Sequence, residues 1–124
     1  MTPVEAMAAR KVFVVEDEMM IALMIEDVLR GLGCEIVGPV SRLESALQIA
    51  KEARFDAAIL DITIRGGEVY PVADVLIERD IPFMFASGYG DWALPEAFRG
   101  LPRLPKPFTP DELENALRAL PKAA

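Results

Sequence analysis

The segment VFVVED, residues 12–17, decides the fold, because four apolar residues run directly into two carboxylates. β-Branched and aromatic residues favour extended backbone, and a strand without polar alternation is typical of a sheet covered on both faces. The apolar residues that follow recur at helical spacing, at Ile21, Met24, Ile25, Val28 and Leu32. A buried strand followed by an amphipathic helix predicts a parallel α/β sheet.

The same strand–helix unit recurs along the chain. Apolar runs at residues 34–37, 57–60, 83–86 and around 101–104 predict four further strands. Helical patterns separate them, and two begin at sequences typical of a capping box, at residues 41–44 and 109–112. A third helix is expected between the third and fourth strands, with Val72, Ala73 and Leu76 on one face, and a short helix is expected from about Pro95.

Proline and apolar content predict the order of the strands. The runs at residues 12–15, 57–60 and 83–86 are apolar throughout, so we expect these strands inside the sheet. The last run contains Pro102 and precedes Pro105, and proline cannot donate to a ladder, so it belongs at an edge. The flavodoxin-like (βα)5 three-layer sandwich, with a parallel sheet of order 2-1-3-4-5, meets these demands.

Composition excludes several classes of function. The 124 residues carry 20 acidic and 13 basic side chains, a net charge of −7, one cysteine and no histidine. Histidine-dependent triads and histidine-ligated zinc sites are therefore excluded, and the acidic balance argues against nucleic acid or anionic membranes as partners. The longest apolar run, residues 19–25, is too short to span a bilayer, and the N-terminus lacks a signal-peptide pattern, so we expect a cytoplasmic protein.

Polar side chains stand where the predicted strands end. Glu16 and Asp17 follow the first strand, Asp61 the third, Ser87 the fourth and Lys106 the fifth. Ligands of such sheets bind at the carboxyl ends of the strands, so these groups should meet at one edge. Neighbouring carboxylates repel one another, and Mg²⁺ relieves that repulsion, while an ammonium and a hydroxyl can hold phosphate oxygens. The set suits phosphoryl transfer to a carboxylate.

Four motifs carry a resemblance to a known family. VVEDE (residues 14–18), ILDI (59–62), FASGYG (85–90) and KPF (106–108) together resemble the CheY-like receiver domain of two-component response regulators. The resemblance extends from Lys11 to about Leu120, which predicts a receiver domain at 11–120 with tails at 1–10 and 121–124. FASGYG, with PVAD before it, is similar to a group of mostly single-domain regulators that carry FATGYG.

The resemblance implies a role for each polar residue of the predicted site. Asp61 would accept the phosphoryl group, and Ser87 and Lys106 would bind its oxygens, with a cis peptide between Lys106 and Pro107. The implied cofactor is Mg²⁺, held by Glu16, Asp17, Asp61 and the backbone carbonyl of Thr63.

The resemblance also implies partners. The phosphoryl donor would be a sensor histidine kinase or a histidine phosphotransfer protein, and a downstream protein of unknown identity would receive the signal through altered contacts. We expect no nucleic-acid or membrane partner and a monomer or weak dimer. We also expect no attached output domain, and no enzymatic activity beyond the protein's own phosphoryl transfer and dephosphorylation.

Arg103 and Ser87 depart from the residues usual in the family. Receivers usually carry Tyr or Phe three residues before the lysine, as a switch that reports phosphorylation, and here that position is Arg103. We hypothesise that Tyr89, the aromatic residue nearest Ser87 in sequence, takes over part of this switch. Ser87 itself replaces the commoner threonine and keeps the hydroxyl.

Other interpretations stay open. Asp17 and Glu18 are also residues that favour the start of a helix, where negative charge is stabilised. An unphosphorylated pseudo-receiver is the main alternative function. A phosphatase with an aspartate nucleophile is disfavoured because Thr63 stands where a second aspartate is needed, and an FMN carrier because Glu16, Asp17 and Glu18 would repel its phosphate.

Overall fold

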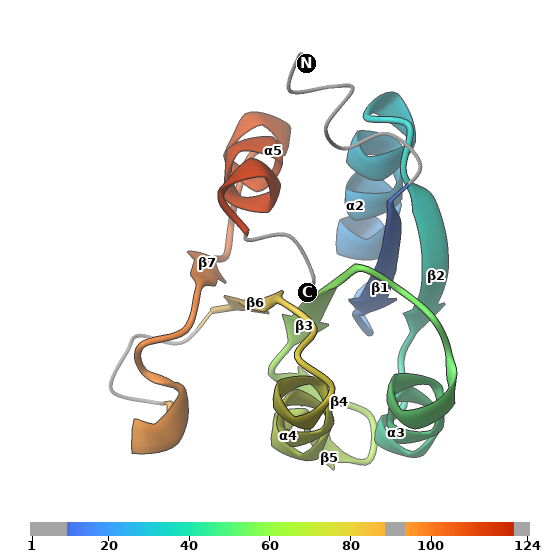
Figure 1. Cartoon of the computed structure of the whole chain (residues 1–124). Coiled ribbons are helices and arrows are strands. Elements are labelled where there is room, and N and C mark those ends of the chain that lie inside the picture. The colour runs from blue at the N-terminus through green and yellow to red at the C-terminus, as the bar shows by residue number, and fades with distance from the viewer. Residues whose placement is uncertain (1–9, 89–93, 121–124) are drawn as a thin grey trace.

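Five parallel strands form one sheet in the computed structural model, which describes residues 10–88 and 94–120 (Figure 1). Their order, β2-β1-β3-β6-β7, confirms the predicted 2-1-3-4-5 arrangement and the edge position of the last strand. β1, β3 and β6 are inside the sheet, and nearly every side chain on them is buried. The strands are β1 (Lys11–Val15), β2 (Glu35–Val40), β3 (Ala57–Asp61), β6 (Phe83–Ser87) and β7 (Arg103–Pro105).

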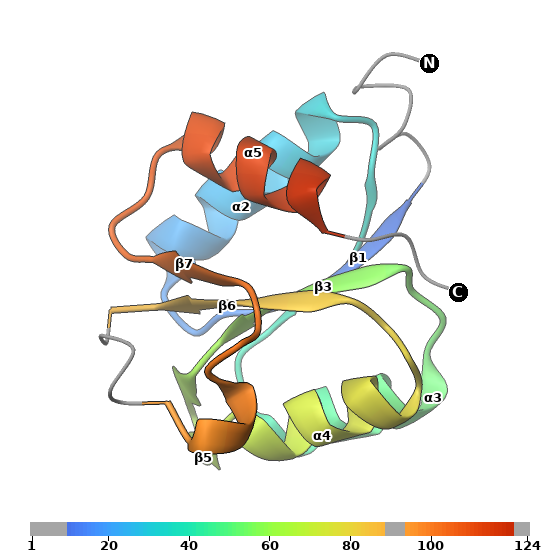
Figure 2. The ribbon, with the colours of Figure 1, turned by 60° about the vertical axis from the view of Figure 1, so that its left-hand side comes forward.

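Helices cover both faces of the sheet (Figures 1 and 2). α2 (Met19–Gly31) and α5 (Pro110–Ala119) lie on one face, and α3 (Leu43–Glu52) and α4 (Tyr70–Glu78) on the other. The described chain therefore forms three layers. No helix in the described ranges is long and apolar enough to cross a membrane.

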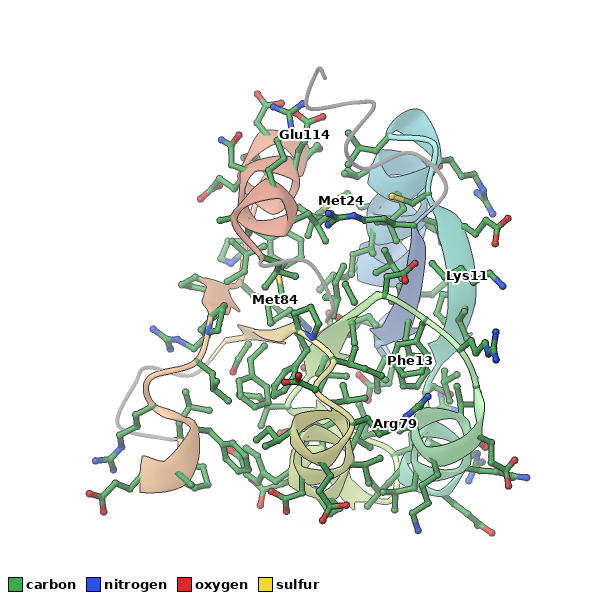
Figure 3. The ribbon with its side chains drawn as sticks, in the orientation of Figure 1. Lys11, Phe13, Met24, Arg79, Met84 and Glu114 are labelled. Carbon is green, nitrogen blue, oxygen red and sulfur yellow. The ribbon has the colours of Figure 1, made fainter. Side chains whose placement is uncertain are left out.

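The sheet separates two hydrophobic cores. Alternate side chains of the central strands point to opposite faces, which is the period-two geometry of β-structure. Phe13 and Phe85 belong to the core under α3 and α4, whereas Met84 belongs to the core under α2 and α5. Figure 3 shows Phe13 and Met84 on opposite sides of the sheet.

One predicted capping box is confirmed and the other is wrong. Thr109 starts α5, where its hydroxyl accepts from the Glu112 N–H at 3.1 Å and its own N–H donates to Glu112 Oε1 at 3.0 Å. α3 instead begins after Arg42 with no side-chain cap. The Leu43 N–H donates to the Arg65 carbonyl at 2.8 Å, so a backbone oxygen from a distant loop satisfies the helix start.

Two further segments differ from expectation because backbone geometry overrides local pattern. The second strand was expected at residues 34–37 but spans Glu35–Val40, with Gly38 at φ +101°. A Cβ at Gly38 would lie 2.7 Å from the Val14 carbonyl oxygen, so glycine lets β2 stay paired with β1 there. The loop after β3 contains a short antiparallel hairpin, β4 (Thr63–Ile64) and β5 (Gly67–Glu68).

The helix expected from about Pro95 is a single 3₁₀ turn, η2 (Glu96–Phe98). Its anchor is Phe98, whose buried ring stacks on Tyr70 at 5.2 Å between centroids and meets Phe85 edge-on at 5.8 Å. Aromatic contacts of this kind hold a short segment that has too few backbone hydrogen bonds to be stable alone.

Candidate functional site

Four strand ends place polar groups at one edge of the sheet. Glu16 directly follows β1, Asp61 ends β3, Ser87 ends β6 and Lys106 directly follows β7. Backbone hydrogen bonds fix this arrangement, because the Lys106 N–H donates to the Ser87 carbonyl at 2.8 Å. The predicted cis peptide between Lys106 and Pro107 is present.

Lys106 is the positive centre of the site. Its ammonium lies 3.0 Å from Glu16 Oε1 and donates to Glu16 Oε2 at 3.2 Å. The same nitrogen lies 3.4 Å from Asp61 Oδ2 and 3.7 Å from Glu18 Oε1. The Lys106 side chain is only 12% exposed, so water screens these charges less than it would at a free surface.

Glu16, Asp17 and Asp61 form a carboxylate cluster with the donor chemistry of a divalent cation site. One oxygen of each lies within 4.8 Å of the others. Glu16 Oε1 is buried and accepts no hydrogen bond within the described ranges, although the Lys106 ammonium lies 3.0 Å away. A buried carboxylate oxygen without a donor is costly, and carboxylates are ligands that Mg²⁺ prefers. The residues present therefore fit the magnesium ion that the sequence predicts.

This environment strongly perturbs Asp61. Burial, then the charge of Glu16 and a hydrogen bond with it, raise the pKa of Asp61 to about 8, although Lys106 acts to lower it. Burial acts to lower the pKa of Lys106, but its hydrogen bond to Glu16 and the surrounding carboxylates outweigh burial and raise it. Without a cation, Asp61 is therefore largely protonated near neutral pH, while Lys106 stays charged.

A pocket of about 650 Å³ opens over the cluster. Its walls include Asp17, Glu18, Asp61, Thr63, Ser87 and Lys106. Ser87 is buried among the residues that line the pocket, whereas Thr63 is exposed at the start of β4. The structure thus brings together every residue predicted for metal and phosphoryl binding, while the Thr63 carbonyl as a metal ligand stays a prediction.

Of the two switch candidates, the structure describes only Arg103, which is not among the residues that line the pocket. Arg103 is half-buried on β7, in register with Phe85 of β6. Tyr89 lies outside the described residues, so its proposed role is untested.

Glu18 was predicted as a helix-start residue and as one of three carboxylates that would repel a bound phosphate, but its approach to Lys106 was not predicted. It precedes α2 without a side-chain cap bond, and its carboxylate turns to the lysine from the solvent side. The sequence did contain a signal for this contact. Glu18 is the third of three consecutive carboxylates, and glutamate is not among the residues preferred as a helix cap.

The sheet order and the carboxylate–lysine cluster define an α/β protein of the flavodoxin-like receiver fold. Two solution structures of SdrG are similar to it over nearly their whole length. SdrG from Sphingomonas melonis Fr1 is 42% identical, with a TM-score of 0.77 over 94% of this chain and 96% of that one. The BeF3-activated conformation of SdrG from Pseudomonas melonis Fr1 is 46% identical, with a TM-score of 0.74 over 89% of this chain and 94% of that one.

Two more distant relatives are also similar to the chain. The receiver domain of the sensor histidine kinase PA1611 from Pseudomonas aeruginosa PAO1 shares the fold, with a TM-score of 0.72 at 23% identity over 90% of this chain and 96% of that one. The sensory transduction protein LytT of Bacillus cereus is 31% identical over 117 residues, 90% of this chain and 47% of LytT. The chain spans about half the length of the curated relatives it matches. No family model matches the chain.

The chain belongs to the family of response regulator receiver domains, which act in two-component signalling. Members of this family are typically not enzymes in the ordinary sense.

Proposed function

We propose that the chain accepts a phosphoryl group on Asp61. The observation that carries this proposal is the placement of the Asp61 carboxylate, buried at the end of β3 and 3.4 Å from the Lys106 ammonium in an open pocket. An Asp61 oxygen would attack the phosphorus, and the bond from phosphorus to the donor would break. The donor leaves with the electron pair, so charge and atoms balance and Asp61 carries the acyl phosphate.

The other residues would bind and orient the group in transit. Lys106 supplies a point charge to one phosphoryl oxygen, and the Ser87 hydroxyl, on the neighbouring strand end, donates to another. Such reactions are catalysed mainly by positioning and electrostatics, which suits a site built on four rigid strand ends.

Glu16, Asp17 and Asp61, with the Thr63 carbonyl, would hold Mg²⁺. The bound ion would supply positive charge to the phosphoryl oxygens and offset the repulsion among the carboxylates. Two observations support this: the carboxylate cluster with its buried Glu16 oxygen that accepts no hydrogen bond within the described ranges, and the magnesium ion coordinated in the active-site cleft of the PA1611 receiver domain.

The donor would be a phosphohistidine on a sensor histidine kinase or a histidine phosphotransfer protein. The 124 residues contain no histidine, so that group must lie outside them. We further propose that the receiver spans residues 11–120, that it acts on an unidentified downstream protein through altered contacts, and that its only catalysis is its own phosphorylation and dephosphorylation.

Intact-mass measurement tests the proposal. The protein is incubated with Mg²⁺ and acetyl phosphate, and we expect the mass of one phosphoryl group on the wild type and none on Asp61→Asn. Asp74→Asn, on the exposed face of α4, is the matched control and should be phosphorylated like the wild type. Absence of added mass on the wild type, or undiminished mass on Asp61→Asn, would refute the proposal, and the first result would favour the pseudo-receiver.

A further inference from the structure

Glu18 has a position that helix formation does not explain. It is the residue that precedes α2, yet its side chain makes no capping hydrogen bond. Glutamate is not among the residues preferred there, because Ser, Thr, Asp and Asn reach the free N–H groups better. The carboxylate instead lies in the wall of the site pocket, 3.7 Å from the Lys106 ammonium.

Glu18 differs from the other carboxylates around Lys106 in exposure. The side chains of Glu16 and Asp61 are 0% and 9% exposed, whereas that of Glu18 is 63% exposed. Glu16 and Asp61 therefore face Lys106 from inside the protein, and Glu18 faces it from solvent. Of the three carboxylates around Lys106, Glu18 is therefore the one most accessible to a phosphodonor in solution.

We propose that Glu18 selects the phosphodonor by charge. Its carboxylate repels anionic phosphodonors in proportion to their charge and partly neutralises Lys106. This inference rests on the proposed function, since it concerns entry to the same site. It makes Glu18 a specificity residue that sets which donors reach Asp61, separate from the residues that hold the phosphoryl group.

Coulomb's law predicts how the rate gain on neutralising Glu18 depends on the charge of the donor. The repulsion energy is proportional to the charge of the donor, so the rate gain on neutralising Glu18 for a dianion should be the square of the gain for a monoanion. For one charge at about 8 Å and an effective dielectric constant of about 60, the gain is roughly threefold. A dianionic donor should then gain about tenfold.

Phosphorylation rates of Glu18→Gln test the proposal. At neutral pH acetyl phosphate is mainly a dianion and phosphoramidate mainly a monoanion. With both donors at subsaturating concentration and Mg²⁺ at saturation, we expect Glu18→Gln to gain about tenfold with acetyl phosphate and about threefold with phosphoramidate. Both gains should shrink at about 1 M NaCl, where the Debye length falls to about 3 Å.

Two control variants separate charge at the pocket from other causes. Glu78→Gln removes the same charge at the far end of α4, at the opposite edge of the sheet, and should leave both rates unchanged. Glu18→Asp keeps the negative charge and should keep the selectivity near that of the wild type. Any loss of favourable charge at the start of α2 would appear as a small fall in melting temperature, which does not depend on the donor.

The outcomes distinguish this inference from the proposed function. If neither donor phosphorylates the wild type, the proposed function fails. If both donors work but Glu18→Gln changes neither rate, or raises both equally, the selection by charge is wrong and the proposed function stands.

Discussion

Opposing influences on the Asp61 carboxyl make its ionisation depend on what binds beside it. Burial and the Glu16 carboxylate favour the protonated form, and Lys106 at 3.4 Å favours the ionised form, with a resulting pKa of about 8. An unfolded aspartate has a pKa near 3.9, so folding costs free energy at every pH where Asp61 must ionise. A divalent cation in the carboxylate cluster would remove that cost.

The first prediction concerns the stability of the metal-free protein as pH rises. Because Asp61 holds its proton in the folded state up to about pH 8 and loses it at about pH 4 when unfolded, the free energy of unfolding should fall between these values. The slope contributed by this group is at most about 1.4 kcal/mol per pH unit. Urea denaturation in EDTA at several pH values measures it.

Asp61→Asn serves as the comparison, since a neutral amide of the same shape cannot titrate. Its stability should fall less with pH than that of the wild type, and Mg²⁺ should stabilise the wild type more at pH 8 than at pH 6. Parallel pH profiles for the two proteins would contradict the raised pKa.

A second prediction concerns Lys106, which competes with a cation for the same carboxylates. Its ammonium neutralises Glu16 and Asp61 at 3.0 and 3.4 Å, so Lys106→Met should bind Mg²⁺ at least about tenfold more tightly. The same variant should be phosphorylated more slowly, because a charge on the phosphoryl oxygens is lost. Isothermal titration and acetyl phosphate kinetics measure the two effects, and weaker Mg²⁺ binding would show that Lys106 does not compete.

Strand ends made most of this site predictable. Asp61, Ser87 and Lys106 each follow a recognisable apolar run, and the parallel topology then determines that they meet. The contact between Glu18 and Lys106 was not predictable in the same way, because it depends on the direction of a long exposed side chain. Strand periodicity contains no information on that direction.

The starts of α3 and α5 show that the capping of a helix depends on its tertiary neighbours as well as on its own sequence. The sequences at residues 41–44 and 109–112 both have the capping-box form, but only Thr109 makes the bonds. At α3 the Arg65 carbonyl already accepts from Leu43, and the Arg65 N–H donates to the Ser41 carbonyl at 3.1 Å. A tertiary contact from the β4–β5 hairpin has replaced the local cap, and no local rule would reveal that.

The third prediction compares the two helix starts. Thr109→Ala should lower the free energy of unfolding by about 1 kcal/mol, because it removes the acceptor for the Glu112 N–H. Ser41→Ala should change it by less than about 0.5 kcal/mol, since no hydroxyl caps α3. Equilibrium urea unfolding of both variants gives the comparison. Equal losses would mean that Ser41 does cap α3 in solution.

The two hydrophobic cores do not form independent units at the scale of the whole molecule. Each central strand contributes neighbouring residues to both cores, so Phe13 and Val14 lie back to back in β1. The loss of packing on one face therefore weakens strands that the other face needs. This coupling could be predicted from the apolar runs, because a strand without polar alternation must be covered on both sides.

The last prediction follows from that coupling. Leu29 is fully buried in α2, and Leu29→Ala should lower the free energy of unfolding by about 2–5 kcal/mol through lost contacts and a cavity. If the molecule unfolds as one unit, hydrogen-exchange protection in α4, on the opposite face, should fall by the same amount as in α2. Leu29→Met keeps the volume and should cost less than about 1.5 kcal/mol. Protection in α4 that survives Leu29→Ala unchanged would show that the α3–α4 layer and the sheet can stay folded without the packing of α2.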